Sequence, residues 1–115
     1  PTTPDEVASE DGATAEVDFR ATFAPTVNNV DEAEYAAKIC NDLVGQENVD
    51  RSPPLIMASE DFSYMLQEKP GAIIFVGNGS TAGLHHPEYD FNDEALPYGI
   101  AFWTNIIEDR LPVSK

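Results

Sequence analysis

The chain has few basic side chains, and this shortage excludes two classes of partner. Six Lys and Arg residues stand against 21 Asp and Glu, which gives a formal net charge of −15 over 115 residues. A nucleic-acid backbone and an anionic membrane surface would both be repelled by that charge. We therefore expect no nucleic acid and no membrane among its partners.

Cysteine is nearly absent as well. A single residue, Cys40, excludes an internal disulfide and a zinc site built from several thiolates. It lies on the apolar stripe of a predicted helix, where a free cysteine usually serves as a small core residue; a ligand or a nucleophile is the alternative. One unpaired thiol and the lack of a secretory signal at the start of the sequence favour a cytoplasmic location.

Long apolar runs are missing too. The longest is about five residues, Ala72–Val76, whereas a membrane span needs roughly twenty. Hydrophobic residues still make up 42% of the chain, which is enough for a modest core.

Hydrophobic periodicity predicts four helices and three strands. The helices are expected at 4–12, at 30–44 with a cap at Asn28 or Asn29, from a cap at Ser59 to just before Pro70, and at about 94–111. Strict alternation over 15–23 predicts a half-buried strand, and the apolar runs 55–57 and 72–77 predict buried strands.

Two of the helices carry an apolar stripe that should face the core. On the second and fourth helices this stripe consists of Ala33, Ala36, Ala37, Cys40, Leu43 and Val44, and of Ile100, Trp103, Ile107 and Leu111.

The pattern changes in kind near residues 27–29. Residues 1–28 form one predicted helix and one alternating strand, which is too little to hold a core alone. Residues 29–115 place apolar strands between helices, as in an α/β layer architecture. We predict a domain boundary at this point.

The stretch GLHHPEYDFNDEALPYG, residues 83–99, holds both histidines of the chain. It follows a predicted buried strand, and α/β folds commonly bind ligands beyond the carboxyl ends of strands. Because neighbouring side chains diverge, only one of His85 and His86 could bind a given metal. The nearby carboxylates could orient that imidazole. The alternative is a plain surface turn.

A second candidate is Ser59-Glu60-Asp61-Phe62. Either Glu60 or Asp61 lines the same crevice as the histidines, or the stretch is an ordinary helix cap followed by acids that favour the helix dipole. The sequence contains no G-x-S-x-G elbow, phosphate-binding glycine loop or basic aromatic groove.

The stretches MASEDFSYMLQEKPGAIIFVGNG and GLHHPEYDFNDEALPYG, with AEVDFRATFAPTVN upstream, resemble a known family. They are similar to the C-terminal part of the metal-dependent amidohydrolases that include hippurate hydrolases, N-acyl-L-amino acid amidohydrolases and plant auxin-conjugate hydrolases. The resemblance covers essentially the whole chain.

This resemblance implies an α/β fold in two domains. A three-layer αβα catalytic domain with a two-metal site is split in sequence by an inserted α+β, ferredoxin-like lid that often dimerises. Residues 1–28 would be the last helix and strand of the lid. Residues 29–115 would be the second segment of the catalytic domain, and a homodimer is one expected assembly.

The resemblance also assigns site residues. His85 matches the histidine of an H-x-P sequence, the last metal ligand of the family, with His86 in the variable position. Glu60 and Ser59 would lie beside the active site, where they contact substrate or support the ligands. Asn92 and Asp93 would hold the loop. No catalytic residue is expected in this chain, because the general-base glutamate and the other ligands belong to the first catalytic segment.

The implied reaction is hydrolysis of the amide bond of N-acyl amino acids by a metal-activated water, with two Zn or Mn ions per complete site. Its partners would be the missing N-terminal catalytic segment and a small N-acyl amino acid. The isolated chain should be inactive. The alternatives are a stand-alone acidic binding module and a dimerisation fragment that pairs through residues 15–23.

Overall fold

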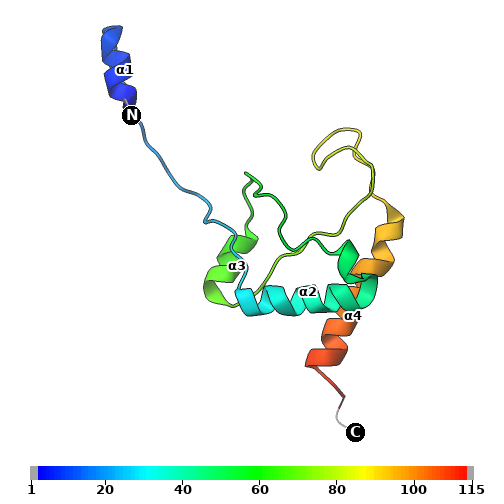
Figure 1. Cartoon of the computed structure of the whole chain (residues 1–115). Coiled ribbons are helices and arrows are strands. Elements are labelled where there is room, and N and C mark those ends of the chain that lie inside the picture. Colours follow the sequence, from blue (N-terminus) through cyan, green and yellow to red (C-terminus); the bar gives the residue numbers. More distant parts are fainter. Residues whose placement is uncertain (1–2, 114–115) are drawn as a thin grey trace.

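The computed structural model describes residues 3–113, and within them helices are the only regular elements (Figure 1). The four α-helices are α1 (Pro4–Glu10), α2 (Val30–Val44), α3 (Phe62–Glu68) and α4 (Leu96–Arg110). Two short 3-10 turns, η1 (Gln46–Asn48) and η2 (Asp93–Ala95), complete the order. The prediction of four helices is confirmed. None of the helices in this described part is long and apolar enough to cross a membrane.

Local sequence signals start and stop the two long helices. The Asn29 side chain accepts a hydrogen bond of 3.2 Å from the backbone N–H of Glu32, which caps the first turn of α2. Gly45 follows the last turn at φ 85°, a value that glycine adopts without steric cost. Pro97 lies in the first turn of α4, where its missing N–H is not needed.

The core forms where α4 crosses α2 (Figure 1). Its three buried hydrophobic residues are Ala36 and Ile39 of α2 and Phe102 of α4. The side chains packed around them are only partly buried: Tyr35, Cys40, Leu43, Ile74 and Ile106. This is a small core for 115 residues.

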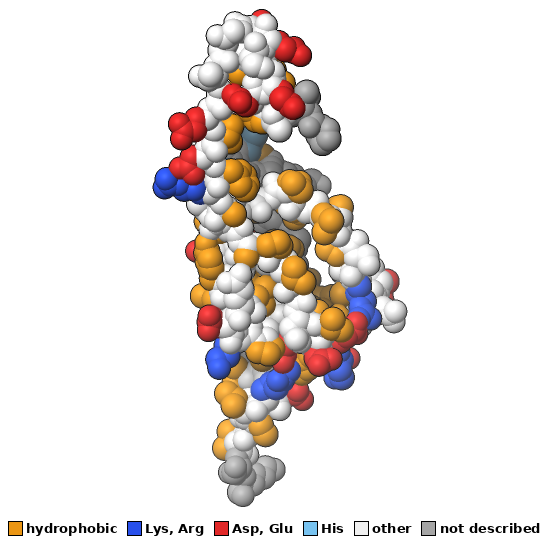
Figure 2. Space-filling model, turned by 90° about the vertical axis from the view of Figure 1, so that its left-hand side faces the viewer, with side chains coloured by type: hydrophobic (Ala, Val, Ile, Leu, Met, Phe, Trp, Pro, Cys, Tyr) orange, Lys and Arg blue, Asp and Glu red, His pale blue; other side chains and the backbone are white. Residues whose placement is uncertain are grey.

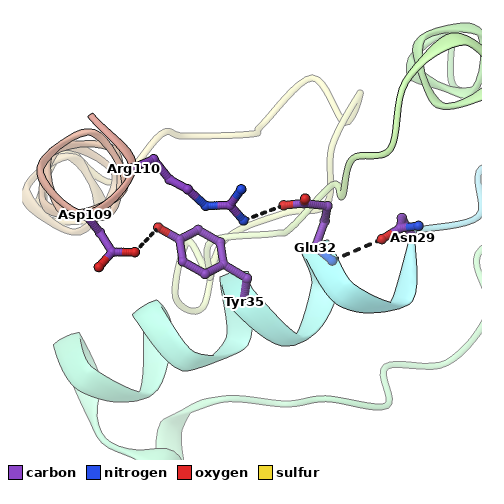
Figure 3. Close-up of polar contacts among 5 residues, drawn as sticks. All are labelled: Asn29, Glu32, Tyr35, Asp109 and Arg110. Atoms are coloured by element: carbon purple, nitrogen blue, oxygen red, sulfur yellow. Dashed lines mark hydrogen bonds and ion pairs between the residues drawn. The ribbon is translucent and has the colours of Figure 1, made fainter. Parts of the chain in front are cut away.

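Polar contacts close the rim of the same helix pair (Figure 3). The Tyr35 hydroxyl donates to Asp109 Oδ2 at 2.9 Å, and the Arg110 guanidinium lies 4.0 Å from the centroid of the Tyr35 ring. Arg110 also donates to Glu32 Oε2 at 2.9 Å. Because these side chains are exposed, solvent screens their contacts, which therefore add little to the stability of the fold.

The predicted core stripe of α4 is wrong. Ile100, Trp103, Ile107 and Leu111 are 55–72% exposed, whereas Phe102 is 8% exposed and packs on α2. Apolar residues surround most of α4, so periodicity identifies a helix without saying which face is covered. On α2 the stripe is right at Ala36, although Ile39, which it did not include, is equally buried.

The three predicted strands form no ladder among the described residues. Segments 15–23, 55–57 and 72–77 run without strand pairing, and Leu55, Met57 and Phe19 are 85–100% exposed. A strand requires a hydrogen-bonded neighbour, and the chain brings no two of these segments together. The three-layer α/β fold, and the division at residue 28, stay predictions.

One side chain nevertheless holds segment 72–77 in place. Asn28 Nδ2 donates to the Ile73 carbonyl at 3.0 Å, and Asn28 Oδ1 accepts from the Ile73 N–H at 2.9 Å. The Asn29 N–H donates to the Gly71 carbonyl at 2.9 Å. The two Asn28 bonds join residues 45 positions apart in sequence, and Asn28 takes the place of a strand partner.

We predict that Asn28→Ala releases this contact. It leaves the partly buried Ile73 N–H and C=O unpaired, which costs about 1–3 kcal/mol. The amide of Ile73 should then exchange with solvent about tenfold faster or more in a hydrogen-exchange NMR experiment. Asn48→Ala is the matched control, because the Asn48 side chain bonds only the nearby Val44 carbonyl. Unchanged exchange at Ile73 in Asn28→Ala would show that this clamp does not hold the segment.

We predict that the Cys40 thiol reacts slowly with alkylating reagents. Burial beside the core raises the pKa of Cys40 above its usual value of 9.0. Less of the reactive thiolate is therefore present at pH 8, and its fraction grows only as the pH rises through the raised pKa. Iodoacetamide should alkylate the folded chain more slowly than the same chain in urea, as measured by mass spectrometry. Faster alkylation of the folded chain would contradict a core role for Cys40.

Candidate functional site

The loop that carries both histidines, residues 78–92, is closed at its base by Asn78. Asn78 Nδ2 donates to the Asp90 carbonyl at 2.8 Å and to Thr81 Oγ1 at 3.1 Å. Asn78 Oδ1 accepts from the Asn92 N–H at 2.8 Å. One amide therefore bonds both arms of the loop. From the sequence, Asn78 is expected only as part of an Asn-Gly turn, which does not predict these hydrogen bonds.

His85 has an unusual backbone. Its φ is 67°, and it is the only non-glycine residue with a positive φ between residues 3 and 113. Such a conformation costs of order 1–3 kcal/mol and is found most often at functional sites. The side chain is exposed, and no hydrogen bond from its imidazole is made within the described residues. Both ring nitrogens are thus accessible to a ligand.

The neighbouring His86 is engaged inside the loop. Its Nδ1 accepts the Glu88 N–H at 3.1 Å, and its backbone bonds the Gly83 carbonyl and the Tyr89 N–H. With Nδ1 acting as acceptor, the neutral ring carries its proton on Nε2. The two adjacent histidines therefore differ in role: His86 shapes the turn and His85 presents its ring to solvent.

Asn92 ends the loop and starts the helix that follows. Its Oδ1 accepts the Glu94 N–H at 3.0 Å and caps η2, which leads directly into α4. The Asp93 side chain next to it is exposed.

The SEDF stretch begins α3, but not in the expected manner. Ser59 is exposed and is not the cap; Glu60 Oε1 instead accepts the Phe62 N–H at 3.0 Å. A carboxylate one residue closer to the helix reaches the first free N–H more directly than Ser59 does. Figure 1 shows α3 and the histidine loop in separate places. Two open grooves lie beside α4, and neither is lined by Glu60 or His85.

Sequence reasoning also missed Ser63, the second serine of SEDFS. Its side chain is 1% exposed, and its Oγ has no hydrogen-bond partner among residues 3–113. A buried hydroxyl without a hydrogen-bond partner is uncommon in native protein structures. The only signal in the sequence was the position of Ser63 in the motif.

The described residues do not make a metal site by themselves. Within residues 3–113 no three His, Cys, Asp or Glu side chains gather closely enough to hold an ion. Cys40 lies at the α2–α4 core and is no ligand candidate. A catalytic zinc site takes three protein ligands, so His85 does not make one with its neighbours among the described residues.

Comparison with known proteins shows the family. The profile of Peptidase family M20/M25/M40 matches residues 1–109. Divalent-metal dependence is typical of that family. No solved structure matches the chain.

Curated relatives agree with this match. IAA-amino acid hydrolase ILR1-like 2 of Arabidopsis thaliana is 40% identical over 86 residues, which are 71% of this chain and 19% of the relative. Hippurate hydrolase of Campylobacter jejuni is 30% identical over 81 residues, 70% of this chain and 21% of the relative. N-acetyldiaminopimelate deacetylase of a Geobacillus strain is 43% identical over 51 residues, 44% of this chain and 14% of the relative.

The chain thus spans about a fifth of the length of the first two of these relatives. The resemblance found in the sequence motifs is confirmed, and the profile match extends from the first residue to within the last few. On this evidence the chain belongs to Peptidase family M20/M25/M40.

Proposed function

We propose that this chain supplies the closing segment of a metal-dependent amidohydrolase that acts on N-acyl amino acids. One observation carries the proposal: His85 of the H-x-P motif presents an unpaired imidazole from a clamped loop, while the described residues provide no cluster to complete a metal site. Such an arrangement is expected of one part of a divided site.

The substrate class follows from the chemistry that the relatives' names share. An IAA-amino acid conjugate, hippurate and N-acetyldiaminopimelate are all amino acids whose nitrogen is acylated. We therefore propose that the complete enzyme to which this chain contributes cleaves that amide bond, with hippurate-like compounds as substrates.

The site residues then receive distinct roles. His85 binds one of two divalent ions, Zn or Mn, in the complete site. Asn92 fixes the loop through the bonds described above. Glu60, Ser59 and Asp93 contact the substrate or orient the ligands. The first catalytic segment supplies the remaining ligands and the general base, so this chain alone is inactive.

The same proposal includes the domain layout. Residues 29–115 form the second segment of a three-layer αβα domain, and residues 1–28 close an α+β lid. The strands of this layout have their partners in the first segment and in the rest of the lid, which accounts for their unpaired state in this chain.

One observation favours a second candidate, a dimerisation module without catalysis. Residues 13–27 run extended and without strand pairing, and Val17 and Phe19 are 62% and 85% exposed. An exposed apolar strand of this kind can pair with a second copy. A homodimer through this segment is also compatible with the hydrolase proposal.

We predict that His85 and His86 differ sharply in a complementation assay. The partner is the Arabidopsis relative with its matched stretch deleted, co-expressed with this chain. Hippurate hydrolysis should appear only in the mixture. His85→Ala should lower it more than about 100-fold, beyond the loss expected from a supporting residue.

His86→Ala is the matched control and should stay within a few-fold of the unsubstituted chain, since the His86 ring serves only the turn. Hydrolysis by this chain alone, or a larger loss in His86→Ala than in His85→Ala, would contradict the proposal.

We predict that Asn78 positions the metal-binding loop. Asn78→Ala removes three hydrogen bonds at the loop base and should lower hydrolysis by the same mixture about 10–100-fold. Asn78→Asp keeps the acceptor for the Asn92 N–H but loses the donor to Asp90, so its loss should be intermediate. Asn105→Ala, whose amide bonds only within α4, is the control and should be neutral. Equal activity in all three variants would remove Asn78 from the site.

A further inference from the structure

Asn78 is followed by Gly79, and no other asparagine of the chain precedes a glycine. This order has a chemical consequence, because the backbone nitrogen of the next residue can attack the side-chain carboxamide carbon of an asparagine and close a cyclic imide. Glycine has no Cβ, so its nitrogen approaches that carbon without steric hindrance. Gly79 is exposed, and its N–H makes no hydrogen bond within the described residues. The pair therefore has the chemistry of a deamidation site.

The folded loop holds the reactive carboxamide in place. Asn78 Nδ2 donates to the Asp90 carbonyl at 2.8 Å and to Thr81 Oγ1 at 3.1 Å, while Oδ1 accepts the Asn92 N–H at 2.8 Å. Attack makes the planar carboxamide carbon tetrahedral, which moves its oxygen and nitrogen out of the positions in which they form these bonds. Ring closure therefore requires the base of the loop to open first.

The reaction consumes water and releases ammonia. The Gly79 nitrogen forms a bond to Asn78 Cγ, and the bond between Cγ and Nδ2 breaks. The proton from the Gly79 N–H is taken up by the departing Nδ2, which leaves as ammonia. Water then opens the imide at either carbonyl, and gives aspartate or isoaspartate, in which the main chain runs through the side-chain carbon. No oxidant or reductant takes part.

Neither product restores the bonds at the loop base. An aspartate carboxylate has no N–H to donate, and it faces the Asp90 carbonyl oxygen where a hydrogen bond stood before. Isoaspartate lengthens the main chain inside the loop and displaces its oxygen from the Asn92 N–H. Conversion of Asn78 therefore opens the base of the loop irreversibly.

We propose that Asn78 is a deamidation site that the hydrogen bonds at the loop base keep unreactive, and that its conversion opens the histidine loop permanently. Thr81 controls the rate in the folded chain, since it provides the only side chain among the three partners; Asp90 and Asn92 use backbone groups. All of these bonds lie within residues 78–92. The proposal is therefore independent of the metal site and of the proposed hydrolase activity.

The test incubates the full chain at mildly alkaline pH and follows it by peptide mass spectrometry, with the two acid isomers separated by chromatography. Asn48 and Asn105 are internal references, because the β-branched residues Val49 and Ile106 follow them and crowd the attacking nitrogen. We expect conversion at Asn78 alone. It should be at least about tenfold faster in urea, where all three bonds are lost. Comparable conversion at either reference, or equal rates at Asn78 in the folded and unfolded chain, would overturn the proposal.

Thr81→Ala removes the hydroxyl that accepts from Nδ2 and should speed conversion of Asn78 in the folded chain about three- to tenfold. Thr81→Ser keeps the hydroxyl and is the matched control, with a rate within about twofold of the original. Unchanged amide exchange at Ile39 and Phe102 verifies that both variants keep the α2–α4 core. If Thr81→Ala reacts no faster than Thr81→Ser, the bonds at the loop base do not protect Asn78.

Two further measurements test the route and the consequence. Gly79→Ala is compared in urea only, because a φ of 79° would strain alanine in the folded loop. Its added methyl group should slow conversion several-fold, and an unchanged rate would exclude attack by this nitrogen. In the folded chain, conversion to isoaspartate should speed exchange of the Asn92 amide about tenfold or more. An Asn92 amide that stays protected would show that the modification does not open the loop.

Discussion

The contact between α2 and α4 is the interaction on which the remaining structure depends. Ala36, Ile39 and Phe102 are the only buried hydrophobic residues among those described, and five partly buried side chains pack against them: Tyr35, Cys40, Leu43, Ile74 and Ile106. Ile74 packs against this cluster and thereby anchors segment 72–77 to the core. Asn28 holds the same segment through its hydrogen bonds to Ile73. The histidine loop follows that segment and returns to α4. The position of His85 is thus set through two steps from one small core.

This small core leaves many large hydrophobic side chains exposed among the described residues (Figure 2). Asn78 closes the loop with bonds that stay within it, so the geometry around His85 requires no contact with a distant layer. By contrast, Ile100 and Trp103 of α4 are more than 60% exposed, and the backbone groups of Ala72, Ile74 and Val76 make no hydrogen bond within the described residues. The loop is therefore closed by its own hydrogen bonds, whereas much of the apolar surface of α4 is exposed.

The sequence predicted those features that depend on neighbours along the chain. The helices were found because caps such as Asn29, stops such as Gly45 and the 3.6-residue period are local signals. The strands did not form because their stability resides in partners that the chain does not bring together. The buried face of α4 was misassigned for a related reason: Ile100 and Phe102 are equally apolar, and only the position of α2 decides between them. In the candidate site, the motif singles out His85, whose role as a ligand stays a prediction, whereas the hydrogen bonds of Asn78 and the burial of Ser63 are seen only in the structure.

The central claim is that the metal site is divided and that this chain holds one ligand of it. Calorimetric titration of zinc into the purified chain, beside His85→Ala, tests this most directly. The account predicts a dissociation constant weaker than about 10 µM, made weaker still by the substitution, because one imidazole falls short of the three ligands that a zinc site needs. Tight, stoichiometric binding by the chain alone would contradict it.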